Sequence, residues 1–249
     1  MHHYDGSRAK LNRAHEHLKE LKFKLERDGR LNRYGLADSC DLQTRERVLY
    51  FNAPSYLFAH YSVIAGEAIG QMRSALDHIV WQLVPKPVEG VTGMPAVWKR
   101  EAYQKRAAKM IAGINNGAAT IIEAAQPFND GGAKSRLYIL NEMWKRDKHR
   151  MLNLVLYQVN AYGRIYFLPD GGVRQFFHAI TPNLEDGAEA IRYAHPPFYK
   201  PEMRMIEQVD FRLELRDPRS GTIYEPFKLL TSLLQFTESL VNNLIATKP

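Results

Sequence analysis

A segment of 27 residues, from Leu57 to Leu83, contains neither proline nor lysine and is followed closely by Pro85 and Pro87. Because proline cannot continue an α-helix, the segment can be helical throughout and has to end there. Its apolar residues recur at spacings of three and four and fall within about 120° of a helical wheel. They are Ala65, Ala68, Ile69, Met72, Leu76, Ile79, Val80 and Leu83. The segment therefore predicts a long helix with one buried face, which other helices have to cover.

The opposite face of this predicted helix carries residues that are unusual for a surface exposed only to water. They are Glu67, Gly70, Gln71, Arg73, Ser74, Asp77, His78 and Trp81. A solvated helix face usually draws on lysine and glutamate, which favour helix and solubility. Short hydrogen-bonding side chains, a glycine and a tryptophan favour a face that packs against a partner, a ligand or a second subunit.

The rest of the chain divides into helical patterns and strand patterns. Helices are predicted at 8–28, 99–110, 118–125, 135–149 and from Pro226 onward, and strands at 47–52, 154–159, 164–168, 173–180 and 206–216, with loops around Cys40 and at 85–97. The fold class is therefore α+β, with a mainly helical bundle core (1–150 and 226–247) and an inserted antiparallel sheet of about four strands (151–225) before the C-terminal helix. We expect a single domain over 1–249, because the last helix needs the earlier ones to bury its apolar stripe.

Composition excludes several classes of protein. The chain has 249 residues, of which 45% are hydrophobic and 24% charged, as in ordinary globular proteins. It has no apolar run of 18 residues and no apolar stretch near its N-terminus, so we expect a cytoplasmic protein without a membrane span or secretory signal. Its one cysteine, Cys40, cannot form an internal disulfide, and the His spacing resembles no zinc motif. We expect no metal and no cofactor.

The net charge of +7 is concentrated in the middle of the chain, where residues 97–150 hold 11 basic and 5 acidic residues. An excess of this kind favours polyanionic partners such as RNA. One basic group comprises Lys99, Arg100, Lys105, Arg106 and Lys109, and a second is the run from Lys145 to Arg150. The first group is explained as well by a solvated helix face as by a phosphate-binding face.

Arg73 lies at the seam between the two faces of the long helix, so its guanidinium is expected to be partly buried and to need a carboxylate. Asp77, four residues later, is one candidate partner. Asp147 is a second, because it falls in the same arc as the apolar residues of the helix predicted at 135–149. We expect Asp147 to face Arg73. The ion pair could equally be a structural one that fixes helix register and carries no chemistry.

Two strings in the sequence carry a resemblance to known proteins: GEAIGQMRSALDHIVWQLV, from Gly66 to Val84, and RDKHR, from Arg146 to Arg150. Together they resemble a widespread group of uncharacterised bacterial proteins that pair a helix of the type LRSALDH with a downstream DKHR. The resemblance covers the helical core and the general order of helices, then strands, then a helix.

Arg73 and His78 also have the Arg-x4-His spacing that marks HEPN domains. These are all-helical modules, many of which are metal-independent endoribonucleases of toxin–antitoxin and phage-defence systems. A comparable spacing occurs at Arg8 and His15, but the position on the lysine-free helix favours Arg73. HEPN modules are commonly smaller, and neither an inserted sheet nor a DKHR run belongs to their signature.

The resemblance implies RNA cleavage by attack of a 2′-OH on the adjacent phosphate. His78 would move the proton, Arg73 would stabilise charge on phosphate oxygens, and Asp77 would orient one of them. Because Arg73 and His78 stand about 140° apart on one helix, they would converge across a two-fold homodimer. Supporting roles would fall to Glu67, Ser74, Asp147 and His149, and phosphate binding to Lys148 and Arg150. An antitoxin or defence partner would accompany such an enzyme.

Whether the protein is an enzyme is left open by the sequence. The main alternative is a non-catalytic helical binding or regulatory protein, whose Arg73, Asp77, His78 and Asp147 form a structural polar network. Small-molecule hydrolysis at a pocket beside the sheet is a third hypothesis. The first two differ in what Arg73→Ala does: it abolishes RNA cleavage in one case and lowers the melting temperature in the other.

Overall fold

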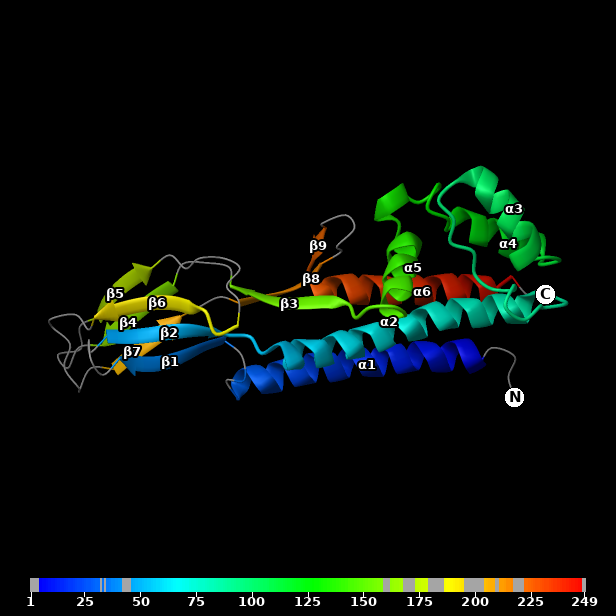
Figure 1. Cartoon of the computed structure of the whole chain (residues 1–249). Coiled ribbons are helices and arrows are strands. Elements are labelled where there is room, and N and C mark those ends of the chain that lie inside the picture. The colour runs from blue at the N-terminus through cyan, green and yellow to red at the C-terminus, as the bar shows by residue number, and fades with distance from the viewer. Residues whose placement is uncertain are drawn as a thin grey trace. The chain divides into compact units, whose positions relative to one another are not determined.

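The computed structural model describes residues 5–31, 33, 35–41, 46–158, 162–167, 173–178, 186–194, 204–208, 211–216 and 222–247. Its helices are α1 (Asp5–Arg30), α2 (Ser55–Leu83), α3 (Arg100–Met110), α4 (Asn116–Ala124), α5 (Arg136–Asp147) and α6 (Pro226–Ile245), with a short 3-10 helix at Gly132–Lys134 (Figure 1). The α+β class is thus confirmed.

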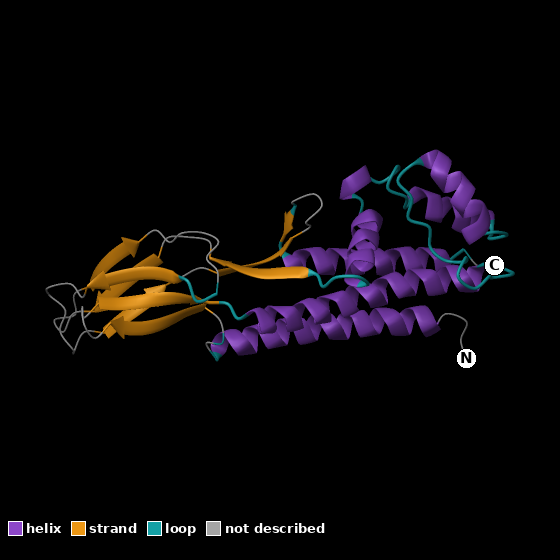
Figure 2. Cartoon of the chain, in the orientation of Figure 1, coloured by secondary structure: helices purple, strands orange, loops and turns teal. Residues whose placement is uncertain are grey.

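Nine strands are present in the described part of the chain: β1 (Gly35–Asp41), β2 (Glu46–Asn52), β3 (Asn153–Gln158), β4 (Tyr162–Phe167), β5 (Val173–His178), β6 (Glu189–Ala194), β7 (Arg204–Gln208), β8 (Phe211–Arg216) and β9 (Ile223–Tyr224). They form three sheets of three strands, in the orders β1-β2-β6, β3-β8-β9 and β5-β4-β7. Figure 2 shows the strands in orange and the helices in purple. The prediction of one sheet of about four strands was wrong. The strand predicted at 206–216 is split into β7 and β8, and residues 159, 168 and 179–180 of the other predicted strands lie outside the described residues.

The loop expected around Cys40 was also wrong, because this segment is strand β1. Its residues, GLADSCD, are poor strand formers by composition. They are extended because β1 pairs antiparallel with β2 over seven positions, from Gly35 opposite Asn52 to Asp41 opposite Glu46. On its other edge β2 pairs with β6. Backbone pairing across the sheet therefore overrides the local preference of β1 for a loop.

The chain separates into two compact units. One comprises residues 1–23, 61–153 and 224–249 and is called here the helical unit; the other comprises 24–60 and 154–223 and is called the sheet unit. The sheet unit thus includes 24–60, a segment that the sequence pattern assigned to the helical core. The expectation of a single folding domain stays a prediction.

Most of the predicted core face of α2 is confirmed, because Ala65, Ala68, Met72 and Ile79 are fully buried, as are Ile69, Leu76 and Val80. Leu83, at the end of the helix, is only half-buried. In the helical unit, α6 contributes Leu230, Leu233 and Val241 to the same kind of apolar interior. It begins as its sequence predicts: Pro226 occupies the first turn and Glu225 caps the helix by accepting hydrogen bonds from the backbone of Phe227 and Lys228. No described helix has the length and apolar character needed to cross a bilayer.

Candidate functional site

Arg73 lies within the helical unit with only 5% of its surface exposed. Its Nη2 donates one hydrogen bond to Oδ1 of Asp77 at 3.0 Å and another to the carbonyl oxygen of Met94 at 2.5 Å. The guanidinium carbon lies 5.3 Å from the ring centroid of Trp144, on α5. Burial lowers the pKa of Arg73, and the charge of Asp77 opposes that shift. These four residues are called here the Arg73 network.

Asp77 connects α2 to the loop that follows it. Its Oδ1 accepts a hydrogen bond from the backbone N–H of Met94 at 2.9 Å as well as the one from Arg73. The loop approaches closely because residue 93 is glycine: a Cβ there would lie 2.9 Å from the same carboxylate oxygen. One carboxylate therefore fixes both a buried guanidinium and the backbone of the loop. Sequence reasoning identified Arg73 and Asp77 as partners but missed Gly93 and Met94.

Asp147 does not face Arg73, so that expectation was wrong. Its carboxylate occupies the space that a side chain at residue 66 of α2 would fill, which only glycine leaves open. Gly66 precedes Arg73 by seven residues, or about 10 Å along a helix. Burial raises the pKa of Asp147, and the nearby charge of Glu67 adds to the increase. The helical wheel predicted correctly that Asp147 points at α2, but a wheel gives no height along the axis.

His78 is exposed. A Cβ added to Gly6, in the first turn of α1, would lie 3.0 Å from Nδ1 of His78. The imidazole therefore borders α1, whereas the guanidinium of Arg73 borders α5 and the loop. Within one chain the structure pairs Arg73 with Asp77, and among the described residues no contact between the His78 side chain and either of them is recorded.

Glu67 has a partner that sequence reasoning missed. His17 of α1 is buried, with 4% of its side chain exposed, and its Nδ1 lies 3.3 Å from Oε2 of Glu67. Glu20 is a more distant neighbour of the same nitrogen, at 3.9 Å. The available signal was the position of His17, three residues after Ala14 and four before Leu21 on the apolar stripe of α1. A histidine at a core position needs a polar partner.

The basic run of the second string lies at the C-terminal end of α5. Lys148, His149 and Arg150 are exposed, and Nζ of Lys148 lies 3.7 Å from the ring centroid of Trp144. Lys148 and Arg150, which were predicted to bind phosphate, are therefore at the surface, whereas Arg73 is buried. Ser74, predicted to support the site from α2, is half-buried.

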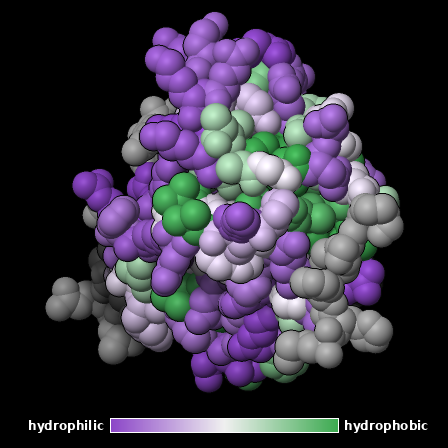
Figure 3. All heavy atoms as spheres, turned by 90° about the vertical axis from the view of Figure 1, so that its right-hand side faces the viewer, coloured by the Kyte–Doolittle hydropathy of each residue, from purple (hydrophilic) through white to green (hydrophobic). Residues whose placement is uncertain are grey.

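The residues of the basic group at 99–109 have different surroundings. Arg100 pairs with Glu123 at 2.6 Å and with the amide of Asn129. Lys105, Arg106 and Lys109 instead line an open hollow of about 660 Å³, together with Gly90, Val91 and Met110. The end of the helical unit that carries α3 and α4 presents a largely hydrophilic surface with small apolar areas (Figure 3). Arg100 is therefore engaged within the chain, and phosphate binding by Lys105, Arg106 and Lys109 stays a prediction.

Among the described residues, no group of three or more His, Cys, Asp and Glu side chains is arranged to hold a metal ion. Comparison of the chain with family models, with curated proteins and with solved structures finds no match. The function has to be argued from the geometry of the chain itself.

Proposed function

We propose that the protein binds single-stranded RNA without cutting it, and that the Arg73 network stabilises the fold. The observation that carries this proposal is the burial of Arg73. With 5% of the residue exposed, its recorded polar contacts lie inside the chain, at Asp77 and the Met94 carbonyl. A guanidinium that clamps a phosphate needs direct contact with the phosphate oxygens. The network is therefore assigned to stability, and RNA binding to exposed residues.

The exposed residues best suited to RNA are the cations that follow α5. Lys148 and Arg150 are exposed, and neither has an acidic partner recorded in the described part of the chain. Such cations bind phosphates by releasing condensed counterions. Trp81 on α2 is 40% exposed and offers a ring on which a base can stack. Cations at a helix C-terminus also stabilise the helix by interacting with its dipole. An experiment therefore has to separate RNA binding from helix stability.

The test measures the affinity of a fluorescently labelled single-stranded RNA by anisotropy over a range of salt concentrations. The double variant Lys148→Ala/Arg150→Ala should bind more weakly, and the slope of log affinity against log salt should fall by about 1.4, which is about 0.7 for each lost phosphate contact. The matched control is Arg8→Ala/Lys10→Ala on α1, which removes the same two kinds of charge. Equal losses of RNA affinity in both double variants would show that the RNA is attracted only by the net charge of the protein. That result would contradict the assignment of RNA binding to the cations that follow α5.

Arg73→Lys provides the other half of this test. The variant keeps the positive charge, so RNA affinity per folded molecule should remain that of the wild type while thermal stability falls. Electrophoresis of the RNA after incubation should show it intact. Loss of affinity in fully folded Arg73→Lys would contradict the structural assignment of the network.

Metal-independent RNA cleavage is the second candidate, and the exposure of His78 favours it. An exposed imidazole can take up and release a proton at a bound nucleotide. Because Arg73 is buried, charge on the phosphate would have to be stabilised by exposed cations such as Lys148 and Arg150. The reaction would require a homodimer that brings His78 of one copy to the basic run of the other, and an enzyme of this kind would be held in check by an antitoxin or defence partner.

A cleavage assay with purified protein separates the two candidates. Under the second candidate, wild-type protein cleaves RNA, His78→Ala abolishes cleavage, and His60→Ala, which changes another exposed histidine of α2, does not. Sedimentation should show a dimer. Intact RNA with wild-type protein leaves only the binding function.

A further inference from the structure

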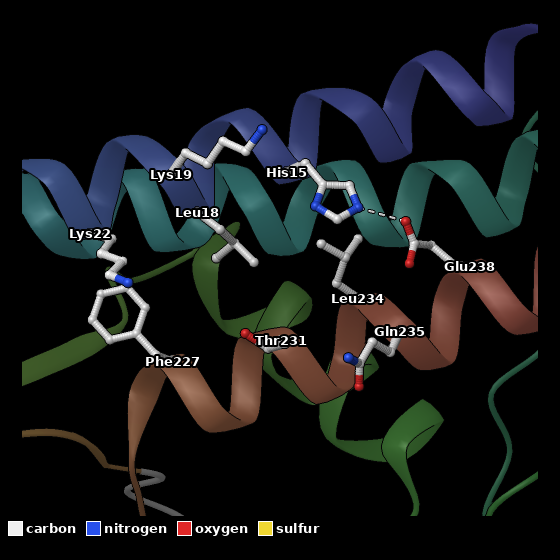
Figure 4. A pocket seen from close by; sticks show the side chains of 9 residues that line it. All are labelled: His15, Leu18, Lys19, Lys22, Phe227, Thr231, Leu234, Gln235 and Glu238. Carbon is white, nitrogen blue, oxygen red and sulfur yellow. Dashed lines mark hydrogen bonds and ion pairs between the residues drawn. The ribbon is translucent and has the colours of Figure 1, made fainter.

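A hollow of about 300 Å³ lies between α1 and α6 of the helical unit. Figure 4 shows side chains from both helices converging on it. Leu18, Leu234 and Phe227 form its apolar part. Its polar lining residues are His15, Lys19, Lys22, Thr231, Gln235 and Glu238. Its volume is at the lower end of the range of ligand pockets, about 300–1,000 Å³, and an apolar lining with a few directional polar groups is typical of such pockets.

His15 is held in one orientation at the end of this hollow. Its Nε2 lies 2.6 Å from Oε1 of Glu238, across the gap between α1 and α6. A carboxylate accepts a hydrogen bond from that nitrogen, so Nε2 carries the proton. In Figure 4 the other ring nitrogen points away from Glu238, toward the side where Leu18 and Leu234 lie. Nδ1 is therefore available to a ligand, as an acceptor when the ring is neutral and as a donor when it is protonated.

Lys19 follows His15 by four residues, so both side chains belong to the same edge of α1. Lys19 is exposed, and the described residues include no acidic group recorded as its partner. The neighbouring Glu16 pairs with Arg13 at 2.8 Å. Two lysines therefore border the apolar lining: Lys22 lies beside the ring of Phe227, and Lys19 lies along α1 (Figure 4). Together with the oriented imidazole they suit a molecule with one anionic end and a hydrocarbon body.

The geometry points to a binding site for a small organic carboxylate, with its apolar chain on Leu18, Leu234 and Phe227 and its carboxylate at Lys19 and, when the imidazole is protonated, at the Nδ1–H of His15. This site is separate from the residues proposed to bind RNA. The volume of about 300 Å³ holds about ten groups at about 30 Å³ each, which matches the non-hydrogen atoms of a carboxylate with an eight-carbon chain.

Calorimetric titration with octanoate tests the site, and octan-1-ol serves as the probe of matched chain length without charge. Wild-type protein should bind octanoate more tightly than octan-1-ol. Lys19→Gln should weaken octanoate binding by about two- to five-fold, as expected for an exposed charge pair, and leave octan-1-ol binding unchanged. Lys10→Gln, which removes a lysine of α1 outside the hollow, should change neither.

Filling the hollow provides the second arm. Thr231 and Gln235 line it from exposed positions on α6, so Thr231→Trp and, independently, Gln235→Trp should abolish binding of both probes without disturbing the core. Ser239→Trp places the same ring elsewhere on α6 and should bind as the wild type does. Circular dichroism identifies any variant that fails to fold. If one of the two tryptophan variants that fill the hollow does not fold, the other one tests whether filling abolishes binding.

Three results would overturn the proposal. The first is no heat of binding with wild-type protein up to about 5 mM octanoate, a concentration above the range of useful affinities. The second is equal affinity for octan-1-ol and octanoate, which would leave an apolar groove without anion recognition. The third is a wild-type dimer that Thr231→Trp converts to a monomer, which would make a second copy the occupant.

Discussion

At the scale of single residues, Arg73 shows how a charge can be kept inside a helical core. Removing one member of a buried charge pair leaves the other without compensation, at a cost of about 3–5 kcal/mol. Arg73→Ala removes the guanidinium donor of Asp77 and of the Met94 carbonyl, while Asp77 keeps the backbone N–H of Met94. We therefore expect a loss toward the lower end of that range in the free energy of unfolding, measured with urea. Arg13→Ala, which breaks an exposed pair with Glu16, should cost less than about 1 kcal/mol. Similar losses in both variants would contradict the structural role of the network.

The contribution of Asp147 to the free energy of unfolding depends on pH in the opposite sense to that of a salt-bridged carboxylate. Because burial and Glu67 raise its pKa in the folded state, the folded protein keeps this proton at pH values where the unfolded chain has lost it. Its contribution to stability is present below the ordinary aspartate pKa of about 3.9 and is lost as the pH rises through the raised value.

Asp147→Asn removes the charge with little change of shape. We therefore expect the variant to melt about 1–3 °C above the wild type at neutral pH, and the difference to disappear near about pH 3.5, where both side chains are uncharged. Differential scanning fluorimetry at both pH values measures this, with Asp130→Asn, at a half-buried aspartate of another segment, as control. A gain of equal size at both pH values would mean that the amide packs better and that ionisation is not the cause.

At the scale of elements, two glycines of α2 that look alike in sequence have different surroundings. Gly66 faces the carboxylate of Asp147, whereas a side chain at Gly70 would meet nothing within 4 Å. Gly70→Ala should stabilise the protein by about 0.5–1 kcal/mol through helix propensity. Gly66→Ala has the same propensity gain but displaces Asp147, so it should be less stable than Gly70→Ala by about 1–3 kcal/mol. Urea unfolding measures both.

The variant Gly66→Ala/Asp147→Ala completes the cycle. If the carboxylate causes the clash, the second substitution should restore most of the stability lost by the first. No restoration would mean that another neighbour limits the space at residue 66. A loss of stability in Gly70→Ala would contradict the open surroundings of that glycine.

Local patterns predicted the helices well because their signals are local. The absence of proline from Leu57 to Leu83 and the position of Pro226 set the bounds of α2 and α6 to within two residues. Strand β1 was missed because its cause is its pairing with β2, which a window of GLADSCD does not contain. For the site, the spacing of Arg73 and Asp77 is one helical turn and was predictable. The contacts at Met94, Gly66 and His17 join distant segments and were not.

At the scale of the whole molecule, the two compact units are assembled from segments far apart in sequence. In the sheet unit, for example, Nζ of Lys24 lies 2.8 Å from Nε2 of His60, 36 residues later. A sequence pattern does not record which distant segment a stretch meets, so residues 24–60 were placed with the neighbouring helices. Both long N-terminal helices contribute residues to both units: α1 crosses the division after Phe23, and α2 crosses it before Tyr61.

Helix continuity predicts that the two units unfold together. A helix is cooperative because its nucleus is costly, so melting one end of α1 destabilises the rest. We expect wild-type protein to show one calorimetric transition, with equal calorimetric and van't Hoff enthalpies. Phe23→Pro together with His60→Pro breaks both α1 and α2 beside the division, and because Phe23 is 58% exposed and His60 is also exposed the two substitutions cost little packing. This double variant should show two transitions. Phe23→Ala/His60→Ala loses the same side chains but keeps both helices and should show one; two transitions in that control or in the wild type would mean that the continuous helices do not couple the units.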